Sequence, residues 1–176
     1  MARQQKTAIV EEKAGVAPAK PLFERVANFL DANEWNYTPA EDKNYFITNC
    51  RIKDAGVRVV IDVYEAEGWQ RVLVYAIYPV YVPEKRRAAA LESIGRINYG
   101  MAVGNFEMDC KDGEIRVRSA VESDTQIGDA MIDRAMRTSI DAADRFFAPL
   151  AAVAFGNAAP ESVLELVTKT EETTLQ

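Results

Sequence analysis

The sequence predicts an α+β domain in which an antiparallel β-sheet carries its helices mainly on one face. Three successive segments between residues 44 and 78 are rich in β-branched and aromatic residues, with short polar turns between them. Two more strand-like segments alternate apolar and polar residues around an Asp-Gly pair, between Met101 and Glu122. Helical periodicity occurs before, between and after these strands. A chain of 176 residues with 48% hydrophobic content can bury one sizeable core, so we expect a single domain over 21–156.

The N-terminal residues divide into a tail and a helix. Residues 1–20 are rich in Ala, Gln, Lys and Glu without apolar periodicity, which predicts a flexible tail. Pro21 suits the first turn of a helix. The apolar residues that follow are three and four positions apart, and the pattern ends near Asn33: Leu22, Phe23, Val26, Phe29 and Leu30.

The three predicted strands that follow are Asn44–Ile52, Gly56–Glu65 and Trp69–Tyr78. The third strand is apolar on both faces, with Val72, Val74, Ala76 and Tyr78 on one and Leu73, Tyr75 and Ile77 on the other. Something must cover the second face, because a large apolar surface is rarely left in water. Two covers remain open at this point: the C-terminal helix of the chain itself, or a second subunit or client polypeptide.

A second helix is expected from Pro83 to about Asn98, with Ala88, Leu91, Ile94 and Ile97 as its apolar stripe. The hairpin comes next, and Asp112-Gly113 would be its two-residue loop. In that register Lys111 faces Glu114, and two further opposite-charge pairs form one face, Asp109 with Arg116 and Glu107 with Arg118. The other face would then pair Cys110 with Ile115 and Met108 with Val117.

A long amphipathic helix is predicted from Asp124 or Thr125, and Pro149 should kink or interrupt it. Ala151–Phe155 would form a further turn, ended by Gly156. Residues 157–176 would form a short C-terminal helix, from Pro160 to Leu166, and a polar tail.

The residue types exclude several kinds of chemistry. The chain contains no histidine, which rules out Ser-His-Asp and Cys-His catalysis and removes the commonest transition-metal ligand. Two cysteines cannot supply the four ligands of a structural zinc site. We therefore predict no catalytic, metal-binding or cofactor-binding residue, no cofactor, and a protein that is not an enzyme.

Charge and cysteine content restrict the partners and the compartment. The net charge of −6 and the pI near 4.9 oppose binding to nucleic acid or to an anionic membrane surface. Cys50 and Cys110 fall inside predicted strands, as small buried thiols do in a reducing compartment. No secretory signal or bilayer-spanning stretch is visible, so a cytoplasmic location is expected. The basic cluster Lys85–Arg87 is interpreted as a solvated helix end, with a small docking patch for an acidic partner as the alternative.

The order helix, three-stranded meander, helix, hairpin, long helix resembles the YbjN-like family of bacterial sensory transduction regulators. The resemblance rests on Arg96–Asp109, on the Asp-Gly turn with the Arg-containing strand Glu114–Arg118, and on a last helix that runs to Pro149-Leu150. It covers about Leu22 to Phe155. The family's fold resembles that of type III secretion chaperones, α-β-β-β-α-β-β-α, and the resemblance implies a non-enzymatic chaperone-like or regulatory binding protein, often dimeric. No catalytic residues come with it.

The functional hypothesis is binding of another polypeptide, or of a second copy in a homodimer, on the second sheet face. The candidate partner-binding residues are Tyr64, Leu73, Tyr75 and Ile77. The alternative is a small-ligand sensor with an apolar pocket between the sheet and the methionine-bearing long helix.

Overall fold

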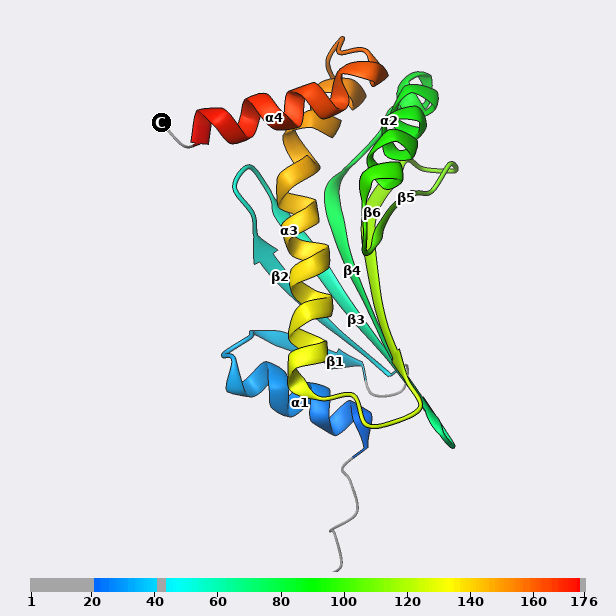
Figure 1. The fold of residues 1–176 in the computed structure, drawn as a ribbon, viewed down its shortest axis with the longest axis vertical. Coiled ribbons are helices and arrows are strands. Elements are labelled where there is room, and N and C mark those ends of the chain that lie inside the picture. The colour runs from blue at the N-terminus through cyan, green and yellow to red at the C-terminus, as the bar shows by residue number, and fades with distance from the viewer. Residues whose placement is uncertain (1–20, 41–43, 175–176) are drawn as a thin grey trace, which may run out of the picture.

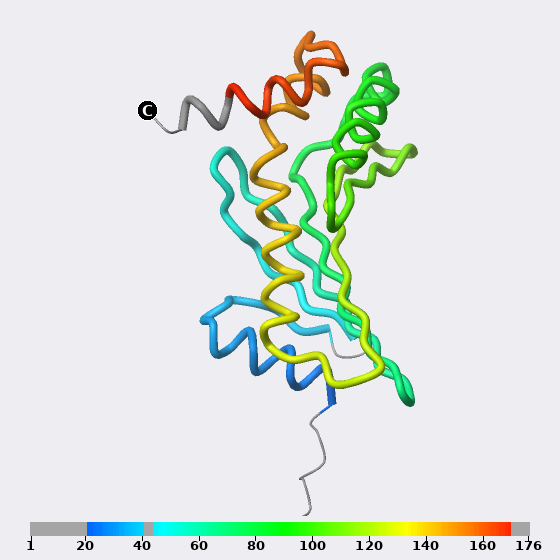
Figure 2. Tube along the Cα trace, in the orientation of Figure 1, coloured from blue at the N-terminus to red at the C-terminus, as the bar shows by residue number. Residues whose placement is uncertain are grey.

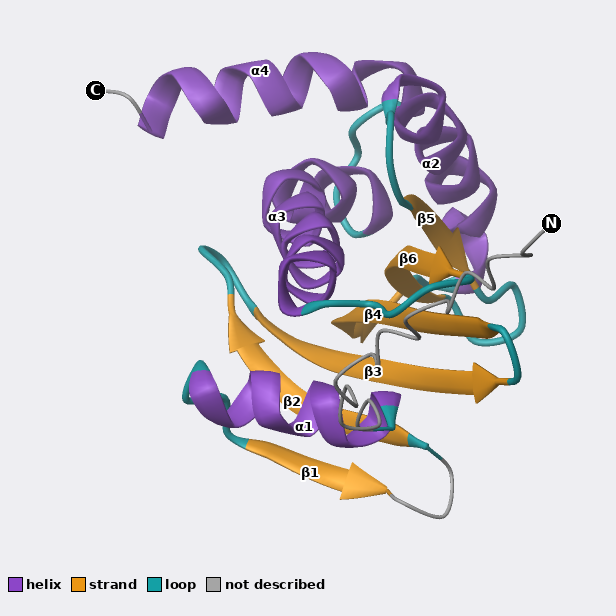
Figure 3. Ribbon diagram, turned by 60° about the horizontal axis from the view of Figure 1, so that its bottom comes forward, coloured by secondary structure: helices purple, strands orange, loops and turns teal. Residues whose placement is uncertain are grey.

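The computed structural model describes residues 21–40 and 44–174, and the predicted tail over 1–20 lies outside them. One antiparallel sheet has the strand order β1-β2-β3-β4-β6-β5, and α1 and α3 lie on the same face of it (Figures 1 and 3). The α+β class and the placement of the helices are therefore confirmed. The helices are α1 (Leu22–Ala32), α2 (Arg87–Gly100), α3 (Asp129–Ala154) and α4 (Val163–Thr174). The strands are β1 (Tyr37–Ala40), β2 (Tyr45–Arg51), β3 (Gly56–Ala66), β4 (Trp69–Tyr81), β5 (Asn105–Met108) and β6 (Glu114–Ser123).

The predicted first helix and the three-stranded meander are present. In α1, Leu22, Val26 and Leu30 are fully buried, and Phe23 stacks on Phe46 of β2 with 4.3 Å between ring centroids. The β-branched and aromatic residues of β2, β3 and β4 therefore form the three predicted strands. Strand β1 was not predicted, because it has four residues and contains Pro39, which is tolerated at a sheet edge.

The hairpin is present, but the predicted register is wrong. Glu107 pairs with Arg116 and Met108 with Ile115. The N–H of Asp109 donates to the carbonyl oxygen of Glu114 at 2.9 Å, so the chain turns through four residues, 110–113. This register buries Phe106 opposite Val117, where its ring meets Phe146 with centroids 5.5 Å apart. Burial of that large ring outweighs the surface charge pairs on which the two-residue turn was argued.

Helix α3 begins at Asp129, later than predicted, and Pro149 lies inside it without ending it. The helix crosses the sheet diagonally, and α4 crosses the far end of α3 (Figures 1 and 2). The hydroxyl of Ser139 donates to the carbonyl oxygen of Val74 at 3.0 Å, and the hydroxyl of Tyr78 donates to that of Ala143 at 2.9 Å. The long helix therefore covers the Val74 face of β4. Helix α4 packs on α2 and α3 on this same side. Of the two covers left open for the Leu73 face, the chain's own C-terminal helix is therefore ruled out.

The basic cluster Lys85–Arg87 also has a different role from the one predicted. The guanidinium of Arg86 donates to the carbonyl oxygens of Val153, at 2.9 Å from Nε, and Ala158, at 3.0 Å. The guanidinium of Arg87 donates to the carbonyl oxygens of Cys110, at 3.1 Å, and Lys111, at 3.2 Å. Carbonyls at the end of a helix attract cations, so Arg86 stabilises the end of α3 and Arg87 holds the hairpin loop. The interpretation of this cluster as a solvated helix end was therefore wrong for Arg86 and Arg87, because both guanidinium groups bind backbone carbonyls.

Among residues 21–40 and 44–174, no helix combines the length and the apolar character needed to cross a bilayer.

Candidate functional site

The sheet face opposite α1 and α3 is called the open face below. All four predicted partner-binding residues lie on it. Leu73, Tyr75 and Ile77 alternate along β4, and their cross-strand neighbours on β3 are Asp62, Val60 and Arg58. Tyr64 lies two positions beyond Asp62 on the same face of β3. The structure therefore brings the four residues onto one surface formed by two neighbouring strands.

The four residues differ in exposure. Tyr64 is 45% exposed, Leu73 and Tyr75 are half-buried, and Ile77 is buried, with 8% of its surface exposed. Two further apolar residues continue the surface, because Ile47 pairs with Val60 and Val60 pairs with Tyr75. An apolar row therefore runs across β2, β3 and β4. The contact between Val60 and Ile47 was not predicted, because it depends on the register between strands.

Charged side chains surround the apolar row as ion pairs. The N···O distance is 3.6 Å for Arg58 with Glu114 and 3.6 Å for Arg71 with Asp62. Glu107 accepts from two arginines of β6, Arg116 at 2.8 Å and Arg118 at 3.1 Å. The guanidinium of Arg116 also lies over the Tyr75 ring, 4.5 Å from its centroid. An apolar centre with Tyr and Arg anchors and a polar rim is the composition of a protein-binding surface.

The edges of the sheet are poor templates for an added strand. At one edge β1 is short and contains Pro39, which has no N–H to donate. At the other edge, the side-chain amide of Asn98 binds the backbone of Phe106 on β5 twice, accepting its N–H at 2.8 Å and donating to its carbonyl at 3.0 Å. Strand addition is therefore disfavoured at both of these edges.

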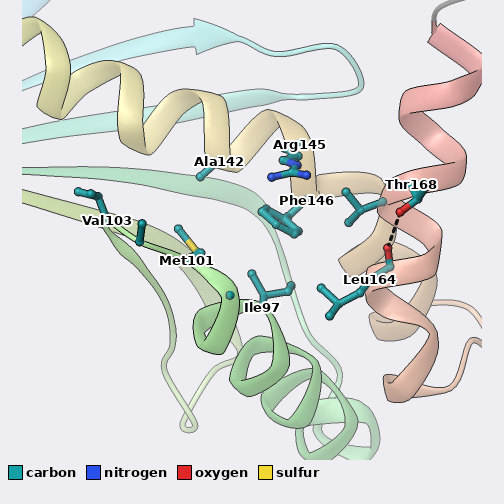
Figure 4. Close-up of a pocket in the computed structure, with 11 residues that line it drawn as sticks. Ile97, Met101, Val103, Ala142, Arg145, Phe146, Leu164 and Thr168 are labelled. Atoms are coloured by element: carbon teal, nitrogen blue, oxygen red, sulfur yellow. Dashed lines mark hydrogen bonds between the residues drawn. The ribbon is translucent and has the colours of Figure 1, made fainter.

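A concave site lies between α2, α3 and α4, away from the open face (Figure 4). Its volume is about 490 Å³, and its walls include Ile97 from α2, Phe146 from α3 and Leu164 from α4. The guanidinium of Arg145 lies 5.3 Å from the centroid of the Phe146 ring. We call this site the helix groove. The groove was not predicted, because its walls come from three segments that are far apart in the chain.

The pocket predicted between the sheet and the long helix is small. A hollow of about 130 Å³ lies there, lined by Ser119, Met131 and Ala135 among others. Ligand sites usually have volumes of roughly 300–1,000 Å³. Of the helix methionines, Met136 is buried in the core and Met131 lies at its edge. The helix groove is the larger of these two spaces.

The buried Tyr78 hydroxyl and the half-buried Cys50 thiol both have raised pKa values, which disfavour their deprotonated, nucleophilic forms. Burial, and then the nearby Asp144 carboxylate, raise the pKa of Tyr78 well above its usual value. Burial, followed by Asp144 and Asp141, also raises the pKa of the Cys50 thiol. A protonated thiol is a weak nucleophile. Cys110 is exposed in the hairpin loop, so its predicted burial within a strand was wrong.

The comparisons with known proteins agree on one family. The model of the YbjN family, described as "Putative bacterial sensory transduction regulator", matches residues 22–152. No curated protein matches the chain. A solved structure, described as "Crystal structure of YbjN, a putative transcription regulator from E. coli", is similar with a TM-score of 0.52 and 12% identity. The similarity covers 69% of this chain and 84% of that one, and at this identity it shows the fold alone. Helix α4 lies outside the matched range.

Proposed function

Because the chain belongs to the YbjN family, we propose that it is a non-enzymatic regulatory or chaperone-like domain that binds another polypeptide through the open face. The observation that carries this proposal is the apolar row of Ile47, Val60 and Tyr75, together with Leu73 and Ile77, on the face opposite the helices. An uncovered apolar patch with a charged rim is typical of protein-interaction sites.

A polypeptide fits this surface better than nucleic acid or an anionic membrane does. The four arginines Arg58, Arg71, Arg116 and Arg118 are each within 4 Å of a carboxylate, so the open face is not a continuous basic surface. The chain as a whole carries a net charge of −6. Phosphate backbones and anionic lipids are bound by clustered, unneutralised cations. A cytoplasmic location is part of the same proposal, since both cysteines are free thiols.

The substitution Leu73→Lys tests the site. A lysine at this position would face Asp62 across the strand pair, so the sheet can accommodate it, while an ammonium group would disrupt the apolar centre of the open face. We expect the affinity for the partner to fall by about tenfold or more, as for other central interface residues. The measurement is capture of proteins from cells that make this chain, followed by the Kd of the recovered protein for each variant.

The matched control is Gln126→Lys, which adds the same charge to an exposed loop residue between β6 and α3. It should leave both the captured proteins and the Kd unchanged. Thermal melting must show that Leu73→Lys is folded at the temperature of the assay. A folded Leu73→Lys variant that binds the recovered protein as well as wild type would contradict the proposal.

A small-ligand sensor is the second candidate function, and the helix groove is the observation that favours it. Its volume of about 490 Å³ falls within the usual range for ligand sites. A ligand at about 100 times its Kd should stabilise the folded chain by roughly 2.7 kcal/mol, which a screen of metabolites would detect as a raised Tm.

The substitution Ala142→Phe should abolish that rise in Tm, because Ala142 lines the groove and a phenyl ring there would fill it. Ala130→Phe, at an exposed position in the first turn of α3, is the control and should leave the rise intact. A ligand that raises the Tm of wild type, Ala142→Phe and Ala130→Phe equally would bind outside the helix groove and would contradict this candidate function.

A further inference from the structure

A separate hollow lies over β2, where the end of α1 meets the middle of α3. Its volume is about 320 Å³, and small-ligand sites usually have volumes of roughly 300–1,000 Å³. Helix α1 and the turn after it supply Phe29, Asn33 and Trp35, β2 supplies Cys50, and α3 supplies side chains that include Asp141. We call this hollow the Trp35 pocket. None of its lining residues belongs to the open face or to the walls of the helix groove.

The walls of the Trp35 pocket are largely apolar. Phe29 and Met136 are buried, while Trp35 and Ile140 are half-buried. A ligand in the hollow therefore buries an apolar group against these four side chains. The indole adds a second property, because the ring face of tryptophan binds cations better than that of tyrosine or phenylalanine.

The backbone at the end of α1 fixes the position of Trp35. The N–H of Trp35 donates to the carbonyl oxygen of Leu30 at 2.9 Å, and the N–H of Glu34 donates to that of Asp31 at 3.1 Å. These are the two hydrogen bonds of a Schellman motif, which has a left-handed residue just after the helix. Glu34 fills that position with a φ of +56°, although glycine is the usual residue there. The motif therefore holds the backbone that carries the indole.

The charges of the pocket favour a cation. Arg137 pairs with Asp133 at 2.8 Å, and Asp141 is a second lining carboxylate, so the lining residues carry one net negative charge. Burial, and then the carboxylates of Asp144 and Asp141, raise the pKa of the Cys50 thiol, so these carboxylates also act on the β2 wall. The C-terminal end of α1 borders the pocket, and the helix dipole attracts cations there.

We propose that the Trp35 pocket binds a small organic ammonium ion that carries an apolar group. The apolar group lies against Phe29 and Met136, and the ammonium group lies between the Trp35 ring and the Asp141 carboxylate. An ammonium group makes a cation–π contact with an indole and charge-assisted hydrogen bonds with a carboxylate. An anion of the same size is repelled by the net negative charge. This site does not depend on the functions proposed for the open face and the helix groove.

Tryptophan fluorescence tests the chemical class of the ligand. Trp35 and Trp69 are the only tryptophans of the chain, so in a Trp69→Phe variant the emission comes from Trp35 alone. The probes are phenethylammonium, phenethyl alcohol and phenylacetate, which share a phenyl group and differ in charge. We expect saturable binding of phenethylammonium with a Kd about tenfold below that of the alcohol, and weaker binding of phenylacetate. Equal Kd values for the three probes, or no saturable binding of phenethylammonium, would overturn the proposal.

Alkylation of Cys50 gives a second readout of the same site. In a Cys110→Ser variant Cys50 is the remaining thiol, and saturating phenethylammonium should slow its reaction with iodoacetamide several-fold, because the ligand covers that wall. The matched control is Cys50→Ser, in which the exposed Cys110 lies outside the pocket and should react at an unchanged rate. Equal protection of both thiols, or no protection of Cys50, would contradict this position of the ligand.

The role of Asp141 is tested by Asp141→Asn, which removes the charge and keeps the shape of the side chain. We expect the Kd for phenethylammonium to rise about fivefold, and the Kd for phenethyl alcohol to stay the same. Asp124→Asn removes the same charge from an exposed loop residue between β6 and α3 and should change neither value. Equal effects of the two substitutions would mean that only the net charge of the chain attracts the ammonium ion, and the assignment of Asp141 would be wrong.

Discussion

Replacing Gly113 with alanine is expected to destabilise the folded chain by about 3 kcal/mol, the sum of backbone strain and a steric clash. Gly113 has a φ of +87°, and a Cβ there would lie 2.3 Å from the carbonyl oxygen of Val82. The approach is fixed by a hydrogen bond, because the N–H of Val82 donates to the carbonyl oxygen of Gly113 at 2.9 Å. The hairpin loop is thereby attached to the segment that leads into α2. Urea unfolding followed by circular dichroism measures the change.

Gly68→Ala is the matched control for Gly113→Ala. Gly68 has a similar φ of +75°, but nothing lies within 4 Å of the position of its Cβ. Only the strain of the left-handed conformation remains there, about 1–2 kcal/mol. Equal losses of stability for the two variants would show that contact with Val82 does not restrict the hairpin.

The second large effect is expected at Arg25, which is 9% exposed and joins three parts of the fold. Its guanidinium donates to the carbonyl oxygen of Ile127 at 2.6 Å and to the side-chain oxygen of Gln70 at 2.9 Å, and it lies 4.0 Å from Glu65. Glu65 in turn accepts the N–H of Leu22 at the start of α1, at 2.7 Å. Helix α1, the β3–β4 turn and the loop before α3 therefore share one polar cluster.

Arg25→Ala should cost about 3 kcal/mol, near the lower end for breaking a buried ion pair, because Glu65 is 38% exposed and partly screened by water. Thermal and urea unfolding would show the loss. Arg137→Ala is the control, since Arg137 pairs with Asp133 at 2.8 Å on the surface and its removal should leave the Tm unchanged within error. Equal Tm values for the Arg25→Ala and wild-type chains would contradict the structural role given to this cluster.

The elements of the fold followed from the sequence because each depends on local periodicity. β-Branched and aromatic residues between short turns placed β3 and β4 within a few residues, and the three-and-four spacing of apolar residues placed α1. The hairpin register did not follow, because it depends on a non-local contact, the packing of Phe106 against Tyr78 and Phe146. The opposite-charge pairs along the two strands favour the two-residue turn, and the sequence alone does not show the packing contact that overrides them.

The candidate sites also differ in how much of each could be predicted from local periodicity in the sequence. The four candidate residues of the open face were correctly placed on one side of the sheet, because the side chains of one strand point alternately to opposite faces, although Ile77 is only 8% exposed. The helix groove was not predicted, and the predicted apolar stripe of α2 was wrong for Ala88 and Leu91, which are exposed. A helix shows periodicity without showing which side meets the core. Leu91 and Ile94 are both apolar and three residues apart, yet one is 40% exposed and the other is buried.

The most direct test of the central claim is site-specific photo-crosslinking in the cells that make this chain. A photo-crosslinking amino acid would replace Tyr64 on the open face, and in a control it would replace the exposed Arg137 on α3. The claim predicts a covalent adduct with a different protein at Tyr64 that is absent at Arg137 and is lost when Leu73→Lys is added. No adduct at Tyr64, or adducts only with a second copy of the chain, would contradict the claim that the open face binds another polypeptide.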